Sequence, residues 1–145
     1  MTRTVFVLNG PNLNMLGKRE PGIYGAKTLA DIEAECMATG QELGINVDFR
    51  QSNHEGVLVD WLHEAHDKAD AVCINPGAYG HTSIALHDAI RAIATPVIEL
   101  HLSNIHAREE FRHKTWTAPA MKGIICGFGA QSYTLALRAA RDLIQ

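Results

Sequence analysis

The stretch Ala71-Val-Cys-Ile-Asn-Pro-Gly-Ala-Tyr-Gly-His81 changes character at Asn75, where four apolar residues give way to loop-forming residues. Two other stretches change in the same way. The apolar residues 4–8 lead into Asn9-Gly-Pro-Asn12, and residues 96–101 lead into Leu102-Ser-Asn104. In an open parallel α/β sheet, ligands bind outside the carboxyl ends of the strands. The three stretches therefore predict strands whose ends bring asparagines, histidines and a serine to one crevice.

The chain has 145 residues, a length that predicts one domain, residues 1–145, with a full hydrophobic core. Its hydrophobic content of 46% and charged content of 20% are typical of soluble globular proteins. A net charge of −3 provides no basic field for nucleic acid, and no apolar stretch is as long as a membrane span. The first residues show no signal-peptide pattern, so a cytoplasmic location is expected.

Strand-like and helix-like patterns alternate along the whole chain. The expected strands are residues 4–8, 45–49, 70–75, 96–101 and 123–127. The expected helices lie between Thr28 and Gly44, around 57–65, over 82–94 and over 133–144, with a short polar helix or turn at 104–114. Right-handed helical crossovers between parallel strands predict an α/β fold, a flavodoxin-like doubly wound five-stranded parallel sheet. Its expected strand order is 2-1-3-4-5, with strands one and three adjacent at the switch point.

The loop over residues 9–27 is long for a compact domain and is rich in glycine and proline. It carries Asn12, Arg19 and Tyr24, as expected of a lid with a reactive group. A solvated surface loop would have a similar composition. A tyrosine ionises near pH 10, so using it as a base at pH 7 costs about 4 kcal/mol. A nearby guanidinium lowers that cost, and both Arg19 and Arg108 are available for this purpose.

Glu99 and His101 are two residues apart in a predicted strand and therefore project from the same face. A carboxylate in an interior strand is costly unless it is paired. A glutamate that orients and charges His101 would satisfy both groups and make His101 a proton donor. The alternative is a purely structural ion pair at the end of a strand.

The residues that follow these strands allow both a functional and a structural interpretation. Ser103 and the backbone beside it could bind an anion such as a substrate carboxylate, or Ser103 could simply cap a helix. His81 could bind substrate hydroxyls or face solvent. Arg112 and Asp88, taken singly, are typical of solvated helix surfaces.

Several other chemistries lack their sequence patterns. The pair His63 and His66 has the wrong spacing to share a metal on one helix face, so no metal site is expected. The chain has no phosphate-binding Walker loop, no complete dinucleotide fingerprint and no nucleophile elbow. Cys36, Cys73 and Cys126 lie in separate apolar segments, which predicts buried reduced thiols.

Taken together, the motifs resemble those of the type II 3-dehydroquinate dehydratase family, from residue 4 to the final helix. The matching segments are Leu8-Asn-Gly-Pro-Asn-Leu-Asn14, Gly17-Lys-Arg-Glu-Pro-Gly-Ile-Tyr-Gly25, Gln51-Ser-Asn-His-Glu-Gly56, Ile74-Asn-Pro-Gly-Ala-Tyr-Gly-His-Thr-Ser83, Glu99-Leu-His-Leu-Ser-Asn104 and Arg108-Glu-Glu-Phe-Arg112. Thr115 departs from the serine usual in the family, and residues 114–119 do not match its pattern. Several long motifs in one order are a specific signal.

The resemblance implies a metal-free and cofactor-free dehydration of 3-dehydroquinate to 3-dehydroshikimate, in aromatic biosynthesis or in quinate breakdown. It implies that Tyr24 removes the proton next to the ketone and that Arg19 lowers the pKa of Tyr24. Asn12 would stabilise the enolate through a water. His101 would protonate the departing hydroxyl, with Glu99 orienting it.

The resemblance also implies how the substrate is held. The backbone at Leu102 and Ser103 would bind its carboxylate, and Arg108 would support the charge on Tyr24. The residues implied to bind the ring hydroxyls are Asn75, His81 and Arg112. Asp88 would reach the site from a neighbouring subunit of a homododecamer built as a tetramer of trimers. The alternatives are a flavodoxin-like phosphate- or flavin-binding module and a non-catalytic binding protein on the same fold.

Overall fold

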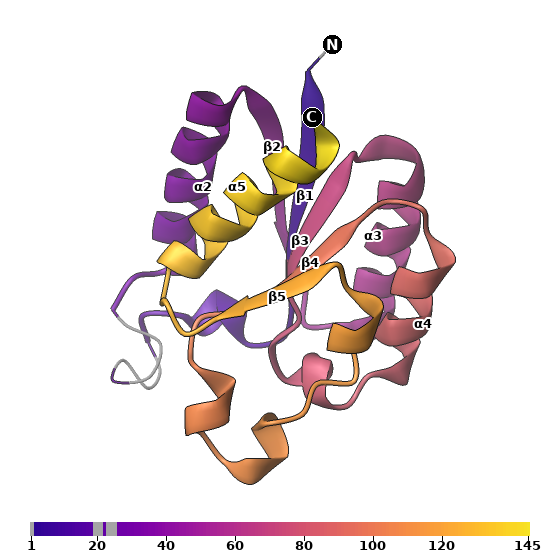
Figure 1. Ribbon diagram of the computed structural model, residues 1–145. Coiled ribbons are helices and arrows are strands. Elements are labelled where there is room, and N and C mark those ends of the chain that lie inside the picture. The colour runs from indigo at the N-terminus through magenta and orange to yellow at the C-terminus, as the bar shows by residue number, and fades with distance from the viewer. Residues whose placement is uncertain (1, 19–21, 23–25) are drawn as a thin grey trace.

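The computed structural model describes residues 2–18, 22 and 26–145 and contains a five-stranded parallel sheet with helices on both faces (Figure 1). The strand order is β2-β1-β3-β4-β5, as predicted. The strands are β1 (Arg3–Asn9), β2 (Ile45–Gln51), β3 (Ala71–Asn75), β4 (Val97–His101) and β5 (Gly123–Cys126). The α-helices are α2 (Leu29–Leu43), α3 (Glu55–Lys68), α4 (Ile84–Ala92) and α5 (Gln131–Ile144). The α/β fold and its flavodoxin-like topology are thereby confirmed.

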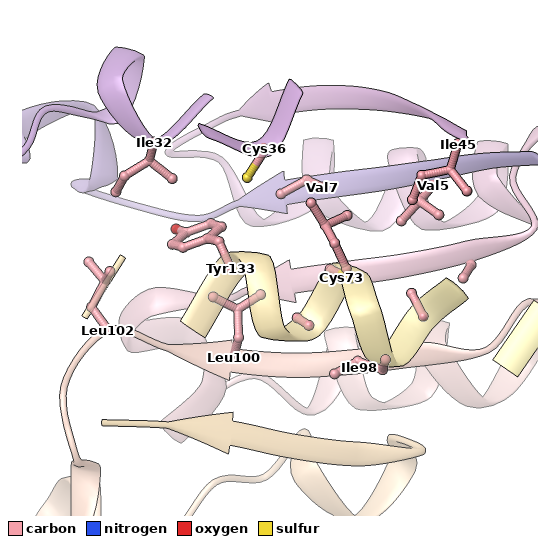
Figure 2. Close-up of a cluster of buried hydrophobic side chains, with 14 of the residues drawn as sticks. Val5, Val7, Ile32, Cys36, Ile45, Cys73, Ile98, Leu100, Leu102 and Tyr133 are labelled. Carbon is pink, nitrogen blue, oxygen red and sulfur yellow. The ribbon is translucent and has the colours of Figure 1, made fainter. Parts of the chain in front are cut away.

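A hydrophobic core lies between the sheet and each of its two helix layers. In Figure 1, α2 and α5 cover one face of the sheet, and α3 and α4 cover the other. On the first face, Ile32 and Cys36 from α2 and Tyr133 from α5 pack against strand residues such as Val7 and Leu100 (Figure 2). The second core is built in the same way from α3, α4 and the opposite side chains of the strands. The central strands β3 and β4 are consequently buried over their whole length, as parallel strands covered on both faces are.

Local sequence signals set where the helices begin and end. Thr28 caps α2 and forms a reciprocal capping box with Asp31, and Gly44 ends the helix in the left-handed conformation, as expected. The helix expected over 82–94 is shorter, because a 3-10 helix, Gly77–His81, precedes it and Ser83 caps α4 through Leu86. Among the helices that the structure describes, none combines the length and apolarity needed to cross a bilayer.

The segment after β4 contains three short 3-10 helices in place of an α-helix. They are Ile105–Ala107, Glu110–Arg112 and Ala118–Ala120. The first two account for the short polar helix or turn expected at 104–114. The thiols of Cys36, Cys73 and Cys126 are all free, and burial raises the pKa of Cys36 to about 12. Cys126 is only half-buried, because β5 is an edge strand, so its predicted full burial was wrong.

Candidate active site

A cavity of about 110 Å³ lies at the carboxyl ends of β1, β3 and β4, the predicted position of the crevice. Most of the residues singled out from the sequence line it. They are Asn12, Asn75, His81, His101, Leu102, Ser103, Arg108 and Arg112. Glu99 lies beneath His101 as its hydrogen-bond partner. The predicted site residues Arg19 and Tyr24 lie outside the described residues, and Asp88 lies on α4, exposed and away from this cavity.

The loops after β1 and β3 approach each other closely and so bring Asn12 and Asn75 to one place. The Gly10 amide donates to the Asn75 carbonyl oxygen at 2.9 Å. A Cβ atom at Gly10 would lie 2.4 Å from the carbonyl oxygen of Pro76, so only glycine fits there. Asn12 itself adopts a left-handed conformation, with φ of 69°, which asparagine tolerates better than most residues. Strand adjacency and this tight contact together place both loops at the cavity.

Glu99 and His101 form a buried pair at the end of β4. The His101 Nε2 atom donates to Oε2 of Glu99 at 2.7 Å, and the glutamate side chain is fully buried. The second carboxylate oxygen, Oε1, accepts a hydrogen bond from the Thr117 hydroxyl. The pair therefore leaves Nδ1 of His101 as the ring nitrogen that can exchange a proton with a bound molecule.

His81 stacks on His101, with ring centroids 5.7 Å apart. Its Nδ1 atom donates to the carbonyl oxygen of Lys114 at 2.8 Å. Burial lowers the pKa of His81, and the neighbouring His101 and Arg112 lower it further, against the opposing effect of the Lys114 carbonyl. At neutral pH the ring is therefore uncharged, and its Nε2 atom can accept a hydrogen bond from a hydroxyl group.

The amide of Asn75 is fixed by a buried chain of hydrogen bonds. Its Oδ1 atom accepts from the Gly77 amide at 3.1 Å, and its Nδ2 atom donates to the Tyr133 hydroxyl at 2.9 Å. Tyr133 in turn donates to Oδ1 of Asn9 at 2.6 Å. Burial raises the pKa of Tyr133, so the phenol keeps the proton that it donates. We call Asn75 and His101, together with the buried side chains that hold each of them by hydrogen bonds, the strand-end wall.

A second part of the cavity lining is cationic, and we call Ser103, Arg108 and Arg112 the arginine wall. Nη1 of Arg108 donates to the Ser103 hydroxyl at 3.3 Å. Both arginines face Glu109, whose carboxylate lies 3.2 Å from Nε of Arg112 and 3.7 Å from Nε of Arg108. A hydrogen bond from its own backbone amide, aided by Arg112, holds the pKa of Glu109 below its usual range. Two guanidinium groups against one carboxylate leave this wall positive.

Ser103 is not the plain helix cap that one interpretation of the sequence allowed. Asn104 caps the following 3-10 helix instead, because its side chain accepts from the His106 amide at 3.1 Å. Ser103 lines the cavity together with Arg108 and Arg112. In the described parts of the chain, no group of three or more histidine, cysteine, aspartate or glutamate side chains could hold a metal.

Sequence reasoning missed the residues that support the strand-end wall. Asn9 could have been found, because it ends β1 directly opposite Asn75 in the register of β1 and β3. Tyr133 lies in the helix expected over 133–144, and nothing in the sequence marked its hydroxyl as part of the site. Thr117 lies in the segment that did not match the family pattern, and only the fold places it beneath β4.

Comparisons with known proteins agree with this geometry. The family model described as "Dehydroquinase class II" matches residues 3–141. A 3-dehydroquinate dehydratase from Rhizobium meliloti is 74% identical over 145 residues, which cover 100% of this chain and 98% of that protein. One from Rhizobium johnstonii is 73% identical over 143 residues, covering 99% of each.

A solved structure shows the same fold. The type II dehydroquinase from Propionibacterium acnes superimposes with a TM-score of 0.94 at 44% identity, covering 98% of each chain. The likeness extends over the whole sheet and both helix layers, including the strand ends that form the cavity. With its motifs, its topology and these relatives in agreement, the chain belongs to the class II dehydroquinase family.

Proposed function

We propose that this chain is a 3-dehydroquinate dehydratase, a hydro-lyase that eliminates water from 3-dehydroquinate to give 3-dehydroshikimate. The observation that carries the proposal is the buried Glu99–His101 pair in a cavity that two arginines also line. An acid in a cavity lined by cationic side chains suits a substrate with a carboxylate and a hydroxyl leaving group. Membership of the family disfavours the alternative of a phosphate- or flavin-binding module.

In the proposed reaction, a phenolate at Tyr24 removes the proton next to the ketone, and the released electron pair forms an enolate. Arg19 and Arg108 favour the phenolate form of Tyr24, and Asn12 stabilises the enolate. The enolate then expels the hydroxyl group, which takes a proton from His101 and leaves as water. The product is a conjugated enone. Before the next turnover Tyr24 must release its proton to solvent, and His101 must take up one proton from solvent.

Two tyrosines of the chain are poorly suited to be this base, which supports Tyr24. Tyr133 is buried, and its hydroxyl is engaged with Asn9 and Asn75. Tyr79 donates its hydroxyl to the backbone carbonyl of Asn53 at 2.7 Å. The third tyrosine in the sequence is Tyr24, within the glycine-rich loop.

The remaining site residues are proposed to hold the substrate. The backbone at Leu102 and Ser103 binds the carboxylate beside the positive arginine wall. Asn75, neutral His81 and Arg112 bind the ring hydroxyls. No metal or organic cofactor enters this scheme.

For the assembly, we propose one catalytic domain over residues 1–145 that forms a homododecamer, a tetramer of trimers, in the cytoplasm. Asp88 fits this proposal, because it is exposed on α4 and does not line the cavity of its own chain, so the role proposed for it would be exercised in a neighbouring subunit. Analytical ultracentrifugation of the purified chain tests it. A monomer at micromolar concentration would contradict it.

The function is tested by adding 3-dehydroquinate to the purified chain and following the ultraviolet absorbance of the enone. We expect a steady rise that survives exhaustive chelation and that Tyr24→Phe slows by about a thousandfold, since a positioned base contributes about that much. Tyr79→Phe is the matched control and should keep the rate within severalfold. No rise from folded protein would refute the function, and a fast Tyr24→Phe variant would refute the base.

A further inference from the structure

Glu99 has two carboxylate oxygens, and the structure gives each one a separate donor. Oε2 accepts from His101, the proposed acid, and Oε1 accepts from the hydroxyl of Thr117. Both Glu99 and Thr117 are fully buried, with no exposed surface. Water therefore has no open route to replace the threonine hydroxyl, and the carboxylate depends on these two protein donors.

The segment that carries Thr117 is fastened to the loop after β3. The Trp116 amide donates to the Gly80 carbonyl oxygen at 2.7 Å, and the Ala118 amide donates to the Thr115 hydroxyl at 2.8 Å. A Cβ atom at Gly80 would lie 3.5 Å from both His101 Cε1 and Thr117 Oγ1. Gly80, His101 and Thr117 therefore form one packed group, in which the threonine hydroxyl is held at Glu99 rather than free to rotate away.

A buried carboxylate oxygen without a donor is unfavourable, and the cost is larger than for a neutral group. A glutamate that lost the donor at Oε1 would relieve this cost by rotating or by taking up a proton. Either response weakens the hydrogen bond from His101 to Oε2. The orientation of the His101 ring, and its capacity to carry a second proton, thus depend on a hydroxyl that does not contact the substrate cavity.

We propose that Thr117 is a positioning residue for the dehydration: its hydroxyl holds Glu99 so that Glu99 holds His101 in the geometry of a proton donor. The inference rests on the proposed function, since the reaction gives His101 its role. It assigns a purpose to the segment 114–119, which was not among the segments that carry the family resemblance in the sequence.

The test compares Thr117→Val, which keeps the shape of the side chain and removes the hydroxyl, with Thr117→Ser, which keeps the hydroxyl. We expect Thr117→Val to lower kcat by about tenfold, the loss typical of one hydrogen bond to a charged group, with KM within twofold. Thr117→Ser should restore kcat to within twofold of the unaltered chain. Equal kcat for the unaltered chain and folded Thr117→Val would overturn the proposal, as would a serine variant as slow as the valine variant.

A matched control separates positioning from general loss of packing. Thr95 is also buried, and its hydroxyl donates to the Ala65 carbonyl oxygen at 3.0 Å, at the opposite end of β4. Thr95→Val makes the same chemical change and should leave kcat unchanged. A comparable fall in kcat for Thr95→Val would mean that the effect is one of stability.

Two further measurements show whether Thr117 acts through Glu99. In a Glu99→Gln background, Thr117→Val should cost less than twofold in kcat, because the charged acceptor is already absent; a full tenfold loss there would contradict the route. The ring-nitrogen NMR signals of His101 should shift in Thr117→Val and stay in place in Thr95→Val. This last result does not depend on turnover, so unchanged signals would defeat the positioning role even if the chain failed to dehydrate 3-dehydroquinate.

Discussion

On the strand-end wall of the cavity, polar side chains are held by buried partners, whereas on the arginine wall they are held by an exposed one. His101 donates a hydrogen bond to Glu99, which is fully buried, and Asn75 donates one to the hydroxyl of Tyr133, which is 1% exposed. Arg108 and Arg112 share Glu109, whose side chain is 51% exposed. The two walls face the same cavity with different degrees of constraint.

This difference indicates that the two walls contribute to different steps of the reaction. Buried hydrogen bonds in a low-dielectric environment fix a single side-chain orientation and are costly to break. A charge at the surface acts over a longer range, is screened by salt and tolerates more than one geometry. We therefore expect the strand-end wall to set the rate of the chemical step and the arginine wall to set substrate affinity.

The largest expected effect comes from removing the proposed acid. His101→Ala should lower kcat by about a thousandfold with a small change in KM, because a positioned acid acts in the transition state. Steady-state kinetics by enone absorbance measures this directly. His63→Ala, at an exposed histidine on α3, is the control and should behave as the unaltered chain. If the His101→Ala enzyme kept a tenth of its kcat, the strand-end wall would not set the rate of the chemical step.

A smaller effect is expected on the other wall. Arg112→Ala should raise KM by about tenfold and change kcat little, because the lost interaction is made with substrate and transition state alike. The effect should shrink only modestly as ionic strength rises from about 0.05 to about 0.5 M, since the Arg112 side chain is 19% exposed and salt screens partly buried charges less than exposed ones.

Arg138→Ala controls for loss of a positive charge, because Arg138 on α5 pairs with Glu42 on α2, does not line the cavity and is half exposed. It should leave both kinetic constants unchanged. A fall in kcat for Arg112→Ala, with KM constant, would show that the arginine wall acts in the chemical step together with the strand-end wall.

The same contrast explains what the sequence could and could not predict. Polar residues at strand ends predicted the cavity, and the spacing of Glu99 and His101 predicted their contact, because both follow from strand geometry. Motif likeness supplied the role of Arg112, which by itself is typical of a solvated charged segment, whereas Arg108 was already available from the sequence as a partner for Tyr24. These features are local in the chain.

The supports of the strand-end wall are not local. Asn75 and Tyr133 are 58 residues apart, and Asn9 and Tyr133 are 124 apart. An apolar helix face predicts that Tyr133 is buried, but it does not say which group meets the hydroxyl. The partner depends on how α5 lies across β1 and β3, which only the assembled fold determines. For this reason, the sequence could not predict the buried partners that support the strand-end wall.

The smallest expected effect on activity comes from this distant support. Tyr133→Phe removes one hydroxyl, leaving Oδ1 of Asn9 and an Nδ2–H of Asn75 without their buried partner. The free energy of unfolding should fall by about 2 kcal/mol, measured by urea denaturation. The value of kcat/KM should fall by about threefold, because Asn75 remains held by the Gly77 amide. A stability loss without any kinetic change would show that the orientation of Asn75 does not matter for turnover, and would confine the rate-setting role of the strand-end wall to Glu99 and His101.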